Sequence, residues 1–365
     1  MKSIKGGSLL RLVAFFVIAA ILTCTVSFAA GGWQSFLQNE PDSDDAANNV
    51  PDGDVDENID GSIENGGEAV VTPILKHYLT GIPISAAELG CAPISFIYSS
   101  DDPLYGISSA FLTVEIPTEN GNTRYLSLFS SNTYLGKIGS ISPTRGYINT
   151  ISAALGAQLV YRGGDDSFSY STSEPIGIDI TQNSGYSYTE YTDYHYTNSD
   201  LVTAMIKNCG VSQVLGNHIR APFIHSDSEI RGQQAAMNVV IPYSDSNTTQ
   251  LAYSTADGKY TLYKGSNAIK DLLNDRTVSY DNVFVLFADA ITYETADATE
   301  TVFDTKGGGS GYYFTRGTAF NISWSVDKDG NLSFYNEMGG RLSVNVGTSY
   351  IAFERSSRKN NIIYK

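Results

Sequence analysis

The chain has 365 residues, a formal net charge of −16 and three cysteines. The charge is divided unevenly, because residues 1–39 carry +3, residues 40–72 carry −11 and residues 73–365 carry −8. No basic stripe is available to release counterions from a phosphate backbone, so the composition argues against nucleic acid as a partner. Three cysteines do not make a disulfide framework. Cys91 and Cys209 are therefore interpreted either as a single bridge or as two buried apolar residues.

The N-terminus predicts on which side of a membrane the rest of the chain lies. Lys2, Lys5 and Arg11 precede an uncharged run of 19 residues, Leu12–Ala30. A run of this length can cross a hydrocarbon core as a helix. Because cations before such a segment stay in the cytoplasm, the residues that follow it are expected to be extracytoplasmic.

Three interpretations of this segment stay open. An uncleaved single-pass anchor in the cell membrane is favoured, because the run is longer than a typical signal-peptide core. Cleavage after Ala29, with small residues at Ser27 and Ala29, would give a secreted protein. Lipidation at Cys24 is disfavoured by Leu22 and Thr23, which precede it. All three place the folded part outside the cytoplasm, on a Gram-positive-type cell surface.

An acidic linker follows the membrane segment. Residues 40–68 hold 11 acids and no base, with few apolar side chains, so this stretch is predicted to be disordered. It contains the opening spacing of a calcium-binding loop at Asp56, Asn58, Asp60 and Gly61. The twelfth position is Gly67 instead of glutamate, and the four histidines of the chain show no metal-ligand spacing. Neither a metal site nor a cofactor is predicted.

The first half of the folded part begins with three predicted strands, at 93–99, 111–117 and 124–130. Asn120-Gly121 between the second and third is a strong hairpin signal. A β-α-β unit with parallel strands is predicted next, from a strand at 137–141, a helix that starts at Ser142-Pro143, and a strand at 157–161. The helical spacing is carried by Tyr147, Ile148, Ile151 and Leu155. A second helix is predicted at 200–208.

The second half is expected to be almost entirely β. Two hairpins are predicted, at 249–253 with 260–264 and at 317–326 with 331–335, together with a buried strand at 283–287. The glycine-rich run 307–311 is interpreted as a turn. The predicted fold class is therefore α+β, with an N-terminal α/β domain that contains the β-α-β unit and a mostly antiparallel, all-β domain after it.

The predicted organisation has five parts: an anchor or signal segment (1–30), an acidic linker (31–72), an α/β domain (73–235), a β-rich domain (236–355) and a basic tail (356–365).

Many short motifs, in order, resemble the YerB-like lipoproteins, a family of two-domain bacterial envelope proteins. In the first half the matching motifs are Phe111–Glu115, Arg124, Lys137–Gly139, Arg145, Tyr147, Gly163-Gly164 and Tyr196–Asn198. In the second half they are Asn282-Val283, Gly309–Thr315 and Ile322–Ser325. The resemblance spans nearly all of residues 75–355. It implies a two-domain envelope protein and no particular activity.

An anion site is predicted at the edge of the β-α-β unit. Arg145 lies in the first helical turn after one strand, and Arg162 follows the next strand. The carboxyl ends of parallel strands share one edge of a sheet, where ligands commonly bind, and the helix start adds its positive dipole end. Arg124 and Asp165 complete the candidate ligand-binding set. The alternative is that Arg145 and Arg162 only brace the fold through ion pairs with Asp165, Asp166 or Glu115.

Two function hypotheses follow. The first is a non-catalytic, membrane-tethered protein that binds a cell-wall polymer, another envelope component or a partner protein. The second is an enzyme that acts on a phosphate-bearing, lipid-linked wall precursor through Arg145 and Arg162, with no catalytic nucleophile identified. The two hypotheses differ in what they require of the arginines, because the second needs them to converge on an open cleft.

Overall fold

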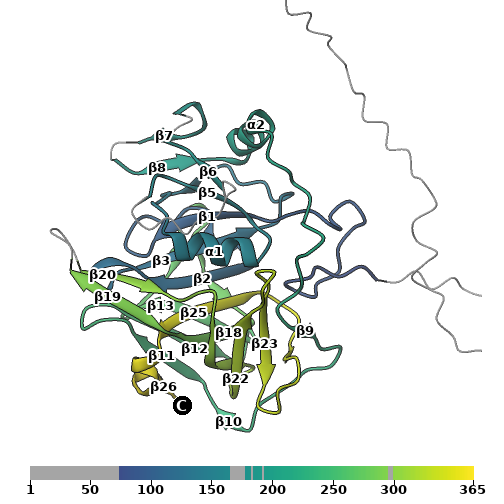
Figure 1. Cartoon of the computed structure of the whole chain (residues 1–365), viewed down its shortest axis with the longest axis vertical. Helices are drawn as coiled ribbons and strands as arrows, with labels where there is room; N and C mark the ends of the chain where they lie inside the picture. Colours follow the sequence, from purple (N-terminus) through teal and green to yellow (C-terminus); the bar gives the residue numbers. More distant parts are fainter. Residues whose placement is uncertain (1–73, 165–176, 182–183, 191–192, 295–298) are drawn as a thin grey trace, which may run out of the picture. The chain divides into compact units, whose positions relative to one another are not determined.

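The computed structural model describes residues 74–164, 177–181, 184–190, 193–294 and 299–365, all within one compact unit, Val70–Lys365 (Figure 1). The predicted membrane segment, the acidic linker, Cys24 and Asp165 lie outside the described residues. Among the helices in the described ranges, none combines the length and the apolar character needed to cross a bilayer.

An eleven-stranded mixed sheet forms the centre of the fold, in the order β10-β22-β21-β18-β25-β2-β3-β1-β5-β6 with β23 paired to β22. Its strands are β1 Ile94–Ser99, β2 Leu112–Pro117, β3 Thr123–Phe129, β5 Gln158–Tyr161, β6 Gly177–Asp179, β10 Gln234–Ala235, β18 Asn282–Ala288, β21 Gly308–Thr315, β22 Thr318–Val326, β23 Leu332–Asn336 and β25 Ser349–Arg355. β25 is parallel to both of its neighbours, β2 and β18. The predicted hairpins β2–β3 and β22–β23 are confirmed.

A second, six-stranded sheet consists of β11 Asn238–Pro242, β12 Thr248–Ser254, β13 Lys259–Lys264, β14 Asn267–Ala268, β17 Ser279–Tyr280 and β26 Ile363–Tyr364. Its buried side chains share one core cluster with Val283, Val285 and Phe287 of β18. The alternate residues of β18, Phe284 and Leu286 among them, belong to a second cluster on the opposite face. This period of two lets a single buried strand contribute to both cores.

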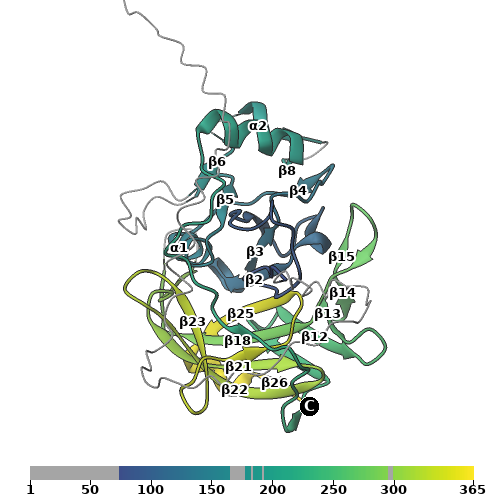
Figure 2. The same ribbon diagram turned by 90° about the vertical axis from the view of Figure 1, so that its right-hand side faces the viewer.

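Helix α1, Gly146–Ala154, covers the face opposite the second sheet. Helix α2, Ser199–Cys209, lies at one end of the molecule beside β8, while the second sheet lies toward the other end (Figure 2). The side chain of Asn198 caps α2 by accepting from the Leu201 amide at 2.9 Å, and Gly210 ends the helix at φ 65°. The predicted helix at 200–208 is confirmed.

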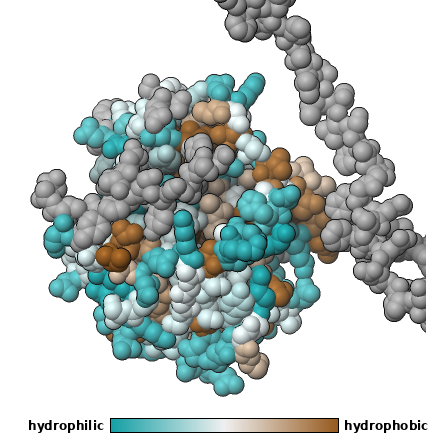
Figure 3. Space-filling model, in the orientation of Figure 1, coloured by the Kyte–Doolittle hydropathy of each residue, from teal (hydrophilic) through white to brown (hydrophobic). Residues whose placement is uncertain are grey.

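The remaining elements are short. The strands are β4 Ile138–Gly139, β7 Tyr188–Thr189, β8 His195–Thr197, β9 Ile224–His225, β15 Lys270–Asp271, β16 Arg276–Thr277, β19 Ala290–Glu294, β20 Thr299–Phe303 and β24 Ser343–Val344. The 3-10 turns are η2 Ile107–Ser109, η3 Glu119–Gly121, η5 Ser184–Tyr186 and η6 Ser356–Asn361. The fold as a whole is mainly β with a few helices. On the face shown in Figure 3, apolar surface is scattered in separate patches.

The predicted β-α-β unit is wrong in its pairing. β4 is only two residues long and pairs antiparallel with β8, whereas β5 pairs in parallel with β1 and β6. The segment after β4 does run parallel to the residues after β5, through a bridge between Thr144 and Gly164. The amide of Ser142 donates to the carbonyl oxygen of Ile97 at 2.8 Å. Because Ser142 is extended in this way, α1 starts at Gly146, with Arg145 at its N-cap.

Two further expectations need correction. The glycine-rich run at 307–311 begins β21 instead of forming a turn, since a Cβ at Gly309 would lie 2.0 Å from the carbonyl oxygen of Phe287. Glycine in a strand often marks such a close backbone approach. Cys91 and Cys209 are both free thiols, and Cys209 is exposed. Cys91 and Cys209 therefore form neither a disulfide with each other nor a pair of buried residues.

The predicted boundary at residues 235–236 falls inside this compact unit. The central sheet contains strands from both sides of it, and β2 from the first half pairs directly with β25 from the second. Both core clusters also mix residues from the two halves. The predicted basic tail is part of the fold, because it forms η6 and β26, and β26 pairs with β11.

Candidate functional site

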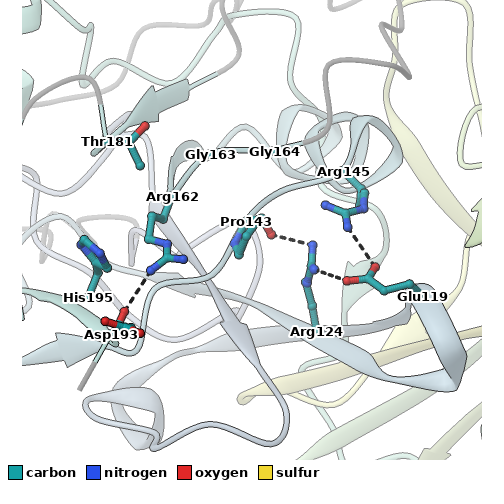
Figure 4. Close-up of a pocket in the computed structure, with 10 residues that line it drawn as sticks. All are labelled: Glu119, Arg124, Pro143, Arg145, Arg162, Gly163, Gly164, Thr181, Asp193 and His195. Atoms are coloured by element: carbon teal, nitrogen blue, oxygen red, sulfur yellow. Dashed lines mark hydrogen bonds and ion pairs between the residues drawn. The ribbon is translucent and has the colours of Figure 1, made fainter. Parts of the chain in front are cut away.

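An open cleft of about 920 Å³ lies beyond the carboxyl ends of β5 and β6 (Figure 4). It is lined by Glu119, Arg124, Pro143, Arg145, Arg162, Gly163, Gly164, Thr181, Asp193 and His195. The lining comes from five separate parts of the chain, which the central sheet and the small β4-β8-β7 sheet bring together. All three arginines that the sequence singled out reach this cleft.

Two of the arginines share one carboxylate. Arg124 Nη2 donates to Glu119 Oε1 at 2.6 Å, and Arg145 Nη2 donates to Glu119 Oε2 at 3.0 Å. Each guanidinium is also held by a backbone carbonyl, because Arg124 Nη1 donates to the oxygen of Pro143 and Arg145 Nη1 to that of Thr144, both at 2.8 Å. Glu119 therefore bridges two oriented cations with its two oxygens.

The β2–β3 turn explains the position of Glu119. Asn120 and Gly121 adopt left-handed conformations, with φ of 55° and 75°. They reverse the chain so that Glu119, at the start of the turn, comes beside Arg124 near the start of β3. The hairpin signal at Asn120-Gly121 predicted this turn, but only the structure shows that Arg145 approaches it from α1.

The charges of Glu119, Arg124 and Arg145 determine the protonation state of these three side chains. Burial alone would raise the pKa of the Glu119 carboxyl, but the guanidiniums of Arg124 and Arg145 hold it below its usual value. Burial lowers the pKa of Arg124, whose side chain is only 9% exposed, without preventing its ionisation. At neutral pH the trio carries two positive charges and one negative charge.

The other end of the cleft holds Arg162 and His195, with Pro143 between the two ends in the view of Figure 4. Arg162 Nη1 donates to the backbone oxygen of Asp193 at 3.0 Å. Burial and the nearby positive charge of Arg162 lower the pKa of His195, so its imidazole is neutral at pH 7. This end therefore offers a guanidinium and a neutral imidazole.

Of the two arginines in the ion-pair interpretation, Arg145 does form an ion pair, although with Glu119, a partner that the sequence did not indicate. Glu115, one of the expected partners, faces the core instead, where it accepts from Thr123 Oγ1 at 2.7 Å and Thr249 Oγ1 at 3.0 Å. Asp165 and Asp166 lie outside the described residues. The positive end of the α1 dipole faces the cleft, as the sequence predicted, because Arg145 is both the N-cap of α1 and a lining residue of the cleft.

Two tyrosines of residues 186–196, a stretch rich in tyrosine, take part in packing around Lys137. Lys137 Nζ lies 4.0 Å from the ring centres of both Tyr105 and Tyr196, and it pairs with Glu190 at 2.5 Å. Tyr188 packs beside Tyr196. These cation–π contacts fasten β4 to β7 and β8. In the part of the chain that the structure describes, no group of three or more His, Cys, Asp or Glu side chains could hold a metal ion.

Comparison with known proteins places this mainly β fold in a class of proteins that carry two linked domains of unknown function. The N-terminal domain model of the protein of unknown function DUF3048 matches residues 79–210, and the C-terminal domain model matches residues 239–351. The chain is 22% identical over 268 residues to "Putative lipoprotein YerB" of Bacillus subtilis (strain 168), covering 68% of this chain and 78% of that protein.

The fold agrees with that relationship. The crystal structure of YerB protein from Bacillus subtilis matches with a TM-score of 0.69 at 17% identity, covering 80% of this chain and 99% of that one. The chain belongs to the YerB-like family, as its short motifs indicated.

Proposed function

We propose that this protein is an extracytoplasmic binding protein of the cell envelope that holds a phosphate-bearing envelope component in the arginine cleft. One observation carries the proposal: three guanidiniums, from β3, the start of α1 and the end of β5, line a single open cleft. Arginine presents a planar set of donors that matches phosphate oxygens and remains charged when partly buried.

The arrangement of charge favours a ligand with more than one anionic group. Arg124 and Arg145 lie at one end of the cleft, and Arg162 with neutral His195 lies at the other (Figure 4). A diphosphate, or two successive phosphates of a polymer, offers more than one anionic group to these cations. Within the part of the chain that the structure describes, the cleft is open to solvent, which suits a ligand that continues beyond its phosphates.

The proposed location rests on the N-terminus and on the relative. The cations before Leu12–Ala30 and the length of that uncharged run support an extracytoplasmic position for the folded part. The name of the Bacillus subtilis relative, a lipoprotein, supports attachment to an envelope membrane. Wall polymers with phosphate linkages and lipid-linked precursors are the anionic ligands available there.

We place binding ahead of catalysis. Among the described residues that line the cleft, Arg124 and Arg145 are already paired with Glu119, and His195 is the sole imidazole. Among the described lining residues the side-chain hydroxyl is that of Thr181, and it donates to Asp179 Oδ1 at 2.8 Å instead of to His195, so a nucleophile with an adjacent base is not assembled in the described part of the cleft. An enzyme acting on a lipid-linked precursor remains the alternative function.

Loss of one cleft arginine is expected to weaken phosphate binding. Arg162→Ala in the full-length protein, in mild detergent, should raise the Kd for inorganic pyrophosphate about tenfold, because one charged contact is removed. Isothermal titration calorimetry measures this, and geranyl diphosphate added in parallel shows whether a lipid chain contributes. Arg162 is a suitable position because its Nη1 donates to a backbone oxygen, that of Asp193, so little of the fold depends on this side chain.

The control is Arg231→Ala, since Arg231 is 58% exposed and lies outside this cleft. Its Kd for pyrophosphate should equal that of the unchanged protein. Absence of pyrophosphate and geranyl diphosphate binding by the unchanged protein would refute the proposed function, as would an equal loss in both variants.

A further inference from the structure

The bridge made by Glu119 has the geometry of a bound anion. Each of the two guanidiniums uses one nitrogen for a backbone carbonyl and gives the other, Nη2, to an oxygen of the same carboxylate. If Glu119 moved away, both Nη2 groups would stay oriented toward the space that its oxygens now fill. Two oxygens of one phosphate group can occupy the same two positions.

We propose that Glu119 is a placeholder for the ligand: its carboxylate occupies the position of a phosphate dianion and turns out into solvent when that group binds. The inference rests on the proposed function of the cleft and deepens it. It makes Glu119 the residue that determines specificity, and it names the ligand class as a phosphate monoester or diphosphate, as opposed to a carboxylate.

The surroundings of Glu119 allow its side chain to leave while the turn stays in place. Its side chain is 25% exposed at the tip of a hairpin. The turn is anchored on both sides, because Asn247 Nδ2 donates to the Gly121 oxygen at 2.9 Å and the Thr299 amide donates to Asn120 Oδ1 at 3.0 Å. Rotation about side-chain bonds is therefore enough to release the carboxylate.

The arginines, by contrast, stay in position. Arg124 is buried, with 8% of its surface exposed, and its hydrogen bond to Pro143 joins β3 to the segment before α1. Arg145 is fixed by its own bond to the Thr144 oxygen and by its place at the helix start. A pair of cations held in this way is preorganised, so a ligand does not bear the entropic cost of ordering them.

Competition with Glu119 selects for doubly charged ligands. A free carboxylate would replace Glu119 with an equal charge, and it would compete against a group whose effective concentration at the site is high. A phosphate dianion brings one more negative charge to Arg124 and Arg145 than the Glu119 carboxylate does. The exchange is therefore favourable for phosphate and unfavourable for carboxylate.

The test compares three glutamate variants of the full-length protein in calorimetric titrations with pyrophosphate and with succinate. Glu119→Gln should bind pyrophosphate about tenfold more tightly than the unchanged protein and should acquire measurable succinate binding. The matched control is Glu229→Gln, because Glu229 also bridges two arginines, Arg231 at 2.7 Å and Arg316 at 3.1 Å, outside the cleft. Its affinity for both anions should stay unchanged.

Glu119→Asp separates displacement from a general effect of charge. Aspartate keeps the negative charge but is one methylene shorter, so it cannot reach both guanidiniums. Displacement predicts tighter pyrophosphate binding for this variant, whereas a general charge effect predicts no change. If Glu119→Gln leaves Arg124 unpaired and fails to fold, which circular dichroism would reveal, Glu119→Asp alone still tests the displacement.

The two ligand sources are distinguished by adding geranyl diphosphate and glycerol phosphate to the same series. A preference for the first indicates a lipid-linked diphosphate, and a preference for the second indicates a phosphate monoester without a lipid chain. Equal or weaker pyrophosphate binding by Glu119→Asp, or a pyrophosphate complex in which Glu119 still bridges Arg124 and Arg145, would overturn the placeholder role. In either case the loss expected for Arg162→Ala would persist, so the proposed function would stand.

Discussion

Replacing Phe284 by alanine is expected to lower the free energy of unfolding by about 4 kcal/mol, because a fully buried aromatic ring is lost and the space is not refilled. Phe284 stacks on Tyr313 at 4.8 Å and on Phe223 at 5.6 Å between ring centres. It lies in β18 with no exposed surface. Chemical denaturation followed by circular dichroism measures the loss.

The same experiment tests whether the two halves of the chain fold together. Because β18 belongs to a sheet shared by both halves, Phe284→Ala should shift one cooperative transition that involves the whole Val70–Lys365 unit. Met338→Ala is the control, since Met338 is 93% exposed and its loss should change stability by less than about 0.5 kcal/mol. Two separate transitions, with only the later half destabilised, would contradict a shared core.

Local patterns in the sequence predicted most elements but not their partners. The helix at α2 and the hairpin β12–β13 depend on caps, turns and alternation within about 20 residues, and both are confirmed. The pairing of β25 with β2 joins residues more than 200 positions apart. No local signal specifies such a contact, so the single sheet that joins the two halves was not predictable from periodicity.

The candidate site was likewise predicted in its local features but not in its long-range contacts. The rule that ligands bind beyond the carboxyl ends of parallel strands placed Arg162 correctly after β5, even though the strand expected beside it pairs elsewhere. Arg145 reaches the cleft for a related reason, because the chain before α1 runs parallel to residues 162–164. Glu119 was missed, since a glutamate beside a hairpin turn is ordinarily solvent-exposed. A search for acids next to Asn-Gly turns would have included it.

The most unusual buried group of the fold is Glu115, at the centre of β2. Its side chain is fully buried between the two sheets and accepts from Thr123, Thr249 and Tyr350. Alternation in β2 explains the position, since Leu112, Val114 and Ile116 point to the opposite core. Burial raises the pKa of the Glu115 carboxyl despite these hydroxyl donors. At a given pH, the Glu115 carboxyl is therefore more often protonated in the folded protein than in the unfolded chain.

Glu115→Ala should be strongly destabilising, whereas Glu115→Gln should not. Alanine leaves three buried hydroxyl groups without their acceptor and a cavity between the sheets, which together cost about 3 kcal/mol. Glutamine fills the same space without charge. Its amide can donate to the Tyr243 hydroxyl, which is buried beside Glu115. Equilibrium unfolding of both variants at neutral pH should separate them clearly.

The pH dependence of Glu115→Gln gives the decisive measurement. A carboxyl whose pKa is raised by folding contributes stability that is present below its ordinary pKa of 4.5 and is lost as the pH rises through the folded value. The stability of Glu115→Gln relative to the unchanged protein should therefore increase from pH 4 to pH 8. His77 acts in the opposite direction, because burial lowers its pKa to about 4, but it is present in both proteins and cancels in the difference. A difference that is constant with pH, or that falls as the pH rises, would show that Glu115 is ionised at no cost and that its hydroxyl partners fully compensate for burial.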